Sequence, residues 1–158
     1  MAIRNIVTEG DEILRKKCRP VGEVTDRIRQ TLDDMVDTMR DRLGVGLAAP
    51  QVGIMRRMFV AEPEPGVVYY MVDPVITKEE GSQECEEGCL SVPGMTGTVT
   101  RPEKITIEGL DRDGKKVSYD FEGFYANVMC HENDHLNGIL YIDKATNIHS
   151  VDEDVEEE

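Results

Sequence analysis

The stretch CHENDHLNG, residues 130–138, holds two of the three histidines of the chain. His131 and His135 are four positions apart, so on a helix they lie one turn apart on one face and can direct both imidazoles at a single ion. Glu132 directly follows the first histidine, where a carboxylate can act as general base beside a metal without binding it. Because solvent-facing helices can carry the same letters, the motif needs a third ligand from elsewhere before it indicates a metalloenzyme.

Cys89 is the first candidate for that third ligand. It lies in EEGCLSVPG, residues 86–94, where Gly88 and a Pro-Gly pair predict a turn-rich segment that can present a side chain into a cleft. A thiolate binds a divalent cation strongly, and three protein ligands leave the fourth position of a catalytic site for water. His149, past the helix and near an acidic run, is expected to be a surface residue rather than a ligand.

Cys85 offers a second interpretation of these ligands. Together with Cys89 and the two histidines it could build a closed structural site, with four protein ligands and no position for catalytic water. The remaining thiols, Cys18 and Cys130, are expected to pack in the interior. The residues by themselves leave the open and the closed site as alternatives.

The stretch GVGLAAPQVG, residues 44–53, is made almost entirely of small residues. Such a composition suits a backbone that must approach a ligand closely, and it also suits tight packing at a turn from helix to strand. Gln51 is its one polar side chain, and an amide can donate a hydrogen bond to an oxygen that gains negative charge during a reaction.

The elements that must position these residues can be predicted from periodicity. Residues 25–43 predict an amphipathic helix with Thr25 as its cap and Gly44 at its end, and its apolar stripe is expected to face the core. A second helix is expected between Gly123 and Gly138, so the histidine motif is helical.

Short β-rich runs lie between the two helices. They occupy residues 57–61, 67–73, 97–101 and 104–110. An Asp-Gly pair after the last run, followed by the alternating Val117, Tyr119 and Phe121, predicts a β-hairpin. Helix, several strands and helix, without strand-helix alternation, predict an α+β fold of mostly antiparallel sheet around a central H-E-x-x-H helix.

Length and charge exclude several classes. The 158 residues suit one domain over 1–150, followed by an acidic tail, 151–158, that is expected to be disordered. A net charge of -14 argues against direct nucleic-acid binding, which depends on lysine and arginine. No window is apolar enough to span a membrane and the N-terminus has no signal-like core, so we expect a cytoplasmic protein.

Three motifs in order resemble those of the peptide deformylases. They are GVGLAAPQ at 44–51, EGCLS at 87–91 and HENDH at 131–135. The resemblance spans residues 1 to about 145 and includes the runs ILRKKCRPV, RPEKITIEGLDRDGK and HLNGILYID. Three motifs with this order and spacing are far more specific than H-E-x-x-H alone.

The resemblance implies a function and a set of roles. Peptide deformylases remove the N-formyl group from the formyl-methionine that begins newly synthesised proteins, releasing formate, with a metal-bound water as nucleophile. The implied cofactor is one divalent ion, Fe²⁺ in the cell, with Zn²⁺, Ni²⁺ or Co²⁺ able to replace it. The implied roles are metal ligation by Cys89, His131 and His135, acid/base catalysis by Glu132, and donation to the formyl oxygen by Gln51 and the backbone N–H of Leu90.

Candidate substrate contacts follow from the same resemblance. The segment at Gly46 is expected to pair with extended peptide backbone, and Gly88 is expected to contact the substrate. An apolar pocket for methionine is expected from Val45, Tyr125 and Val128.

Two departures from the family pattern stand out. Thr96 replaces an arginine of many relatives, so a contact to the peptide backbone is either missing or supplied by Arg101.

The expected partners are N-formylmethionyl nascent peptides. Many bacterial relatives also dock on the ribosome through a C-terminal helix that is often basic, and the acidic end of this chain argues against that route because like charges repel.

Two rival functions stay open on the residues alone. A metalloprotease could use the same H-E-x-x-H helix to cut internal peptide bonds, and a non-catalytic domain could enclose a structural ion. Neither of these functions gives Gln51 a role, so its presence would be a coincidence.

Overall fold

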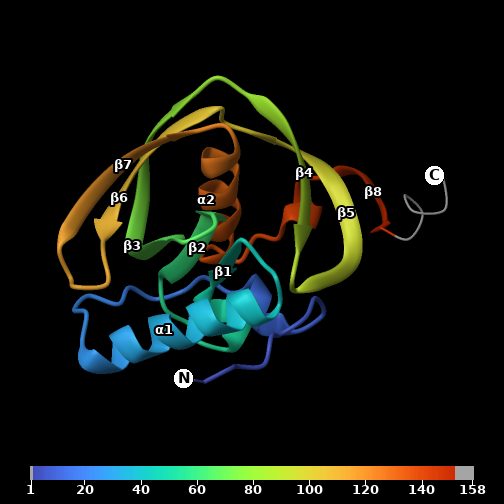
Figure 1. Cartoon of the computed structure of the whole chain (residues 1–158). Coiled ribbons are helices and arrows are strands. Elements are labelled where there is room, and N and C mark those ends of the chain that lie inside the picture. The colour runs from blue at the N-terminus through green and yellow to red at the C-terminus, as the bar shows by residue number, and fades with distance from the viewer. Residues whose placement is uncertain (1, 152–158) are drawn as a thin grey trace.

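The computed structural model describes residues 2–151 and shows two antiparallel sheets with two α-helices (Figure 1). The α-helices are α1 (Asp26–Asp41) and α2 (Phe124–His135), and the 3-10 helices are η1 (Glu12–Arg15), η2 (Ala49–Val52) and η3 (Tyr141–Asp143). The strands are β1 (Gly46–Ala48), β2 (Met58–Glu64), β3 (Val67–Glu80), β4 (Gln83–Cys89), β5 (Val92–Arg101), β6 (Lys104–Leu110), β7 (Lys116–Glu122) and β8 (Thr146–Ser150). The predicted α+β class is confirmed.

The two sheets lie on either side of α2. One sheet has the strand order β1-β2-β3-β6-β7 and the other the order β4-β5-β8, and every pairing within them is antiparallel. Figure 1 shows α2 standing between the sheets while α1 crosses below them. β1 and β4 each form the edge of their sheet, so each has one side without a strand partner.

Helix α1 begins where the sequence predicts. The Thr25 hydroxyl accepts a hydrogen bond from the backbone N–H of Ile28 at 3.3 Å, and one face of the helix packs into a core cluster. The end differs from expectation, because Leu43 rather than Gly44 takes the left-handed conformation, with φ of 58°. Gly44 leaves room for a neighbouring side chain instead, since a Cβ there would lie 2.8 Å from Cδ1 of Leu90.

Most of helix α2 is buried, although Phe124 in its first turn is exposed. Its residues 126–132 are seven consecutive buried residues, which is two turns of helix without an exposed face. Ala126, Met129 and Leu136 belong to one core cluster with residues from the five-stranded sheet. The helix that carries the histidine motif is therefore held in place by the hydrophobic core.

The structure contains strands that periodicity did not indicate. β4 and β8 were not predicted, and β3 and β5 are longer than the runs at 67–73 and 97–101. Of the tail predicted to be disordered, residues 152–158 lie outside the described residues. Within the described part, the helices are too short or too polar to cross a membrane.

Candidate metal centre

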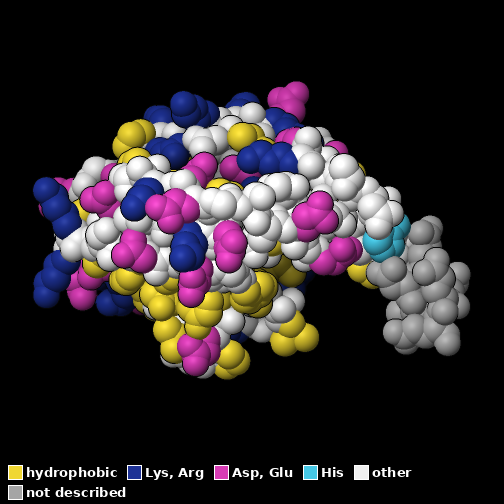
Figure 2. Space-filling model, turned by 90° about the horizontal axis from the view of Figure 1, so that it is seen from above, with side chains coloured by type: hydrophobic (Ala, Val, Ile, Leu, Met, Phe, Trp, Pro, Cys, Tyr) yellow, Lys and Arg dark blue, Asp and Glu magenta, His cyan; other side chains and the backbone are white. Residues whose placement is uncertain are grey.

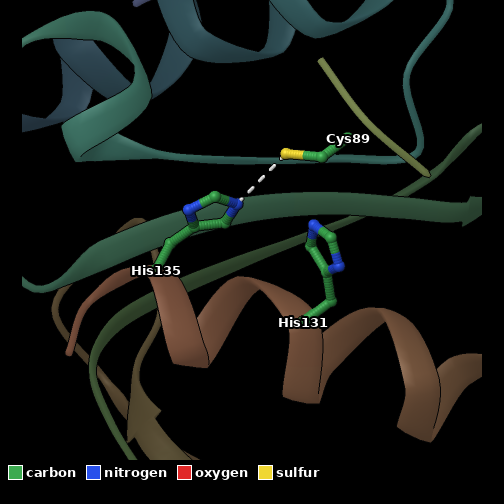
Figure 3. A group of neighbouring side chains, drawn as sticks. All are labelled: Cys89, His131 and His135. Carbon is green, nitrogen blue, oxygen red and sulfur yellow. Dashed lines mark hydrogen bonds between the residues drawn. The ribbon is translucent and has the colours of Figure 1, made fainter. Parts of the chain in front are cut away.

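The three predicted ligands converge on one point. Cys89 is the last residue of β4, while His131 and His135 project from adjacent turns of α2. One ligand atom from each lies within 4.8 Å of the others, and Cys89 Sγ is 3.4 Å from His135 Nε2. Figure 3 shows the Cys89 thiol approaching the two imidazoles from the side that lies opposite helix α2.

The donor set fits a tetrahedral divalent cation. With a metal–sulfur bond of about 2.3 Å and a metal–nitrogen bond of about 2.0 Å, tetrahedral angles place sulfur and nitrogen about 3.5 Å apart. The observed separation of 3.4 Å between Cys89 and His135 is close to that value. Three protein ligands leave one vertex open, as in catalytic sites.

The closed four-ligand alternative is not supported. Among residues 2–151, the group able to hold a metal contains neither Cys85 nor His149. Cys85 is a buried thiol on β4 opposite Val99, and His149 is a half-buried residue of β8. All four cysteines are free thiols.

Glu87 orients the first histidine. His131 Nδ1 donates to Glu87 Oε1 at 2.7 Å, which turns Nε2 toward the site. Arg101 donates to both oxygens of Glu87 at 2.8 Å and to Asp134 at 2.6 Å. Burial opposes ionisation of Glu87, but hydrogen bonds from Arg101 and His131 lower its pKa to about 2, so it remains a carboxylate.

This network corrects one expectation. The Arg101 side chain is only 3% exposed and its donors are committed to Glu87 and Asp134. Of the two alternatives for Thr96, a contact supplied by Arg101 is therefore not supported, and a missing contact stays a prediction. Thr96 is also turned inward, and its single hydroxyl proton has two acceptors within reach, a side-chain oxygen of Glu86 at 2.9 Å and the carbonyl oxygen of Glu87 at 3.1 Å.

Glu132 lies beside the group of three candidate ligands. The side chain is almost fully buried, its Oε2 is 4.0 Å from His131 Nε2, and its Oε1 has no hydrogen-bond partner among the described residues. Burial raises the pKa of Glu132 to about 7, a value that suits a group which both accepts and donates a proton near neutral pH. Gly46 faces this carboxylate so closely that a Cβ there would lie 2.5 Å from Oε2.

The two histidines have different proton affinities. Burial and the neighbouring His131 lower the pKa of His135 well below its ordinary value. Burial also lowers the pKa of His131, but the surrounding Glu132, Cys89 and Glu87 outweigh it and raise that pKa well above the ordinary value. An environment that attracts a proton to His131 also attracts a cation, so protons and metal compete there.

Gln51 lies next to the ligand sulfur. Its Oε1 accepts from the backbone N–H of Ala48 at 2.9 Å, and its Nε2 donates to Ser91 Oγ at 3.0 Å and to Cys89 Sγ at 3.5 Å. The amide is thus fixed at both ends. Leu90, the other predicted donor, follows Cys89 directly in the turn from β4 to β5.

An open cavity of about 590 Å³ leads to this centre. It lies between the edge strands β1 and β4 and the first half of α2. The predicted residues that line it are Val45, Gly46, Gly88, Cys89, Leu90, Val128, His131 and Glu132.

Tyr125 does not line this cavity. Its hydroxyl donates to Glu64 at 2.7 Å, and its ring packs against Tyr69 and Phe121. Phe124 and Asn127 take the places on α2 that face the cavity. The side chains of Glu87, Ser91 and Asn127 were missed as site residues, although a histidine ligand that needs a partner for its second nitrogen is a signal that could have pointed to Glu87.

The charged surface is mixed in sign. Figure 2 shows lysine and arginine side chains interspersed with acidic ones on the face seen from above. Ion pairs such as Lys104–Glu122 and Lys78–Glu80 contribute to this mixture.

Comparison with known proteins places the chain in one family. Residues 3–151 match the family model described as polypeptide deformylase. A peptide deformylase of Symbiobacterium thermophilum is 52% identical over 160 residues, covering 100% of this chain and 74% of that relative. A peptide deformylase of Thermoanaerobacter pseudethanolicus is 47% identical over 158 residues, covering 100% and 98%.

A solved structure has the same architecture. The crystal structure of peptide deformylase from Thermotoga maritima superposes with a TM-score of 0.89 at 36% identity, covering 92% of this chain and 99% of that one.

Proposed function

Since the chain belongs to the peptide deformylase family, we propose that it hydrolyses the N-formyl group from the formyl-methionine of newly synthesised proteins and releases formate. The observation that carries this proposal is the convergence of Cys89, His131 and His135 within 4.8 Å, with the buried carboxylate of Glu132 beside them.

The cofactor we propose is one divalent ion, Fe²⁺ in the cell, with Zn²⁺, Ni²⁺ or Co²⁺ as substitutes. Cys89, His131 and His135 would hold it, since one thiolate and two imidazoles suit all four ions. Bound there, the ion supplies a Lewis acid that polarises the formyl carbonyl and lowers the pKa of water.

Glu132 carries the proton through the reaction. Its carboxylate accepts a proton as water oxygen bonds to the formyl carbon, and it returns that proton to nitrogen as the carbon–nitrogen bond breaks. The products are formate and a peptide with a free amine. In the metal-free protein, burial raises the pKa of Glu132 to about 7, which is near the pH at which a group that both accepts and donates a proton is most effective.

The formyl oxygen needs hydrogen-bond donors as it becomes negative. We assign this role to the backbone N–H of Leu90 and to the Gln51 amide, whose weak 3.5 Å contact with Cys89 Sγ would be exchanged for a hydrogen bond to the formyl oxygen. Ser91 holds the amide in place from the other side.

The peptide is bound by the cavity walls. β1 and β4 are edge strands, so an extended chain can add its backbone hydrogen bonds to Gly46 on one side and Gly88 on the other. Val45 and Val128 contribute apolar surface for the methionine side chain, with Phe124 in place of the expected Tyr125.

Formate release tests the proposal. Anaerobically prepared, iron-loaded protein is given formyl-Met-Ala-Ser, and we expect formate above the metal-free control. Glu132→Ala should retain the metal but lose about 10²- to 10⁴-fold in kcat, whereas Cys89→Ala should also lose metal. Cleavage of internal bonds in an unblocked peptide without any formate release would support a protease instead.

A further inference from the structure

Asn127 is a polar residue in the part of the cavity proposed to hold the first side chain of the substrate. It lies on α2 one turn before His131, so both residues occupy the same face of the helix. Phe124 and Val128 line the cavity around it. The amide side chain of Asn127 thus lies next to two apolar side chains of the cavity wall.

This amide is buried without being satisfied. Asn127 is only 7% exposed, and its side-chain oxygen has no hydrogen-bond partner among the described residues. A buried amide oxygen without a partner destabilises a fold, and leucine has nearly the same shape without that disadvantage. The oxygen itself has almost no accessible surface, so a ligand in the cavity would reach the amide through its Nδ2 group, for which the described residues offer no partner either.

We propose that Asn127 is a specificity-determining residue that lets the pocket accept first residues with a hydrogen-bonding group at the δ position, as in methionine sulfoxide and glutamine. Both side chains have the length of methionine. The Nδ2 group of Asn127 can donate to the oxygen of a sulfoxide or of a second amide, whereas the thioether of methionine is only a weak acceptor. This inference rests on the proposed deformylase activity.

The experiment compares four peptides of the form formyl-X-Ala-Ser. X is methionine, norleucine, methionine sulfoxide or glutamine, and norleucine is the apolar reference of matched length. We expect the wild-type enzyme to release formate from the two polar peptides as well as from the two apolar ones. In Asn127→Leu, kcat/KM for the polar peptides should fall about tenfold relative to norleucine, the size expected when a buried polar group loses its partner.

Asn133→Leu is the matched control. Asn133 is on the same helix and also has a buried amide oxygen without a partner, but it does not line this cavity. For Asn133→Leu, the ratio of kcat/KM for the polar peptides to kcat/KM for the norleucine peptide should equal that of the wild type. Calorimetric binding of the same peptides to Glu132→Ala, with and without Asn127→Leu, should show the same shift without turnover.

The outcomes separate the two proposals. Turnover of methionine and norleucine peptides without turnover of either polar peptide overturns the role of Asn127 and leaves the deformylase assignment intact. An unchanged ratio in a folded Asn127→Leu variant also overturns it. No formate from any peptide overturns both proposals. If Asn127→Leu does not fold, turnover of the polar and apolar peptides by the wild-type enzyme tests the role of Asn127.

Discussion

Gly46→Ala should disable the enzyme without disturbing its metal. An added Cβ would lie 2.5 Å from Glu132 Oε2, 2.8 Å from Cδ and 2.9 Å from Cγ. Carbon–oxygen contacts below about 3 Å are repulsive, because the optimal separation of nonbonded atoms is about 3.5 Å or more. Glu132 must therefore retreat by about 1 Å.

The magnitude follows from that displacement. Glu132 is only 4% exposed and packed in the interior, so it cannot move without losing its alignment. A misplacement of about 1 Å can reduce a rate about 10²-fold, and complete loss of acid/base catalysis about 10²- to 10⁴-fold. We expect kcat to fall by about 10²-fold or more, with one metal ion still bound per chain.

The assay is formate release with metal content measured on the same sample. Gly44→Ala is the matched control, since its added Cβ meets the flexible Cδ1 end of the Leu90 side chain rather than the carboxylate of Glu132, and its loss should be clearly smaller. A Gly46→Ala enzyme with nearly wild-type kcat would refute the reasoning, as would a variant whose lost activity is explained by lost metal.

Three further predictions concern stability, metal affinity and the pocket. The folded pKa of Glu132, about 7, exceeds its ordinary 4.5, so its neutral form stabilises the metal-free protein below pH 4.5 and this contribution is lost as pH rises through 7. In urea unfolding, the free energy of unfolding of Glu132→Gln relative to that of the wild type should rise by about 3 kcal/mol between pH 4.5 and pH 8. A difference that does not depend on pH would contradict this. Glu87→Gln should weaken zinc binding about 10- to 100-fold in a chelator competition, because the acceptor of the His131 hydrogen bond loses its negative charge, and unaltered affinity would show that the Glu87 carboxylate does not support the site. Val128→Ala should reduce kcat/KM for formyl-Met-Ala-Ser by an amount equivalent to about 1 to 3 kcal/mol, and equal losses for a formyl-Ala peptide would show that Val128 does not contact methionine.

Local sequence signals predicted the elements whose own residues determine them. The start of α1 at Thr25 and the hairpin of β6 and β7 depend on a capping side chain, helical periodicity and an Asp-Gly turn. The i,i+4 spacing of His131 and His135 likewise needs only that their segment is helical.

Features that depend on distant partners could not be read in the same way. The inward positions of β4 are Cys85 and Glu87, a thiol and a carboxylate, so the strand lacks the apolar alternation that marks a half-buried strand. Glu87 is tolerated there because Arg101 and His131 meet it from other elements.

The side of α2 that faces the cavity could not be predicted from the sequence either. Because residues 126–132 are all buried, apolar periodicity does not reveal which of them faces the substrate. Tyr125 was expected in the apolar pocket, whereas the structure turns it toward Tyr69 and brings Phe124 and Asn127 to the cavity.

X-ray absorption of the zinc- or cobalt-loaded protein is the most direct test of the central claim. The arrangement of Cys89, His131 and His135 predicts one sulfur at about 2.3 Å and three lighter atoms at about 2.0 Å, two of them imidazole nitrogens and one an exchangeable solvent oxygen. A shell with two sulfurs, or one with no sulfur, would contradict the proposed centre.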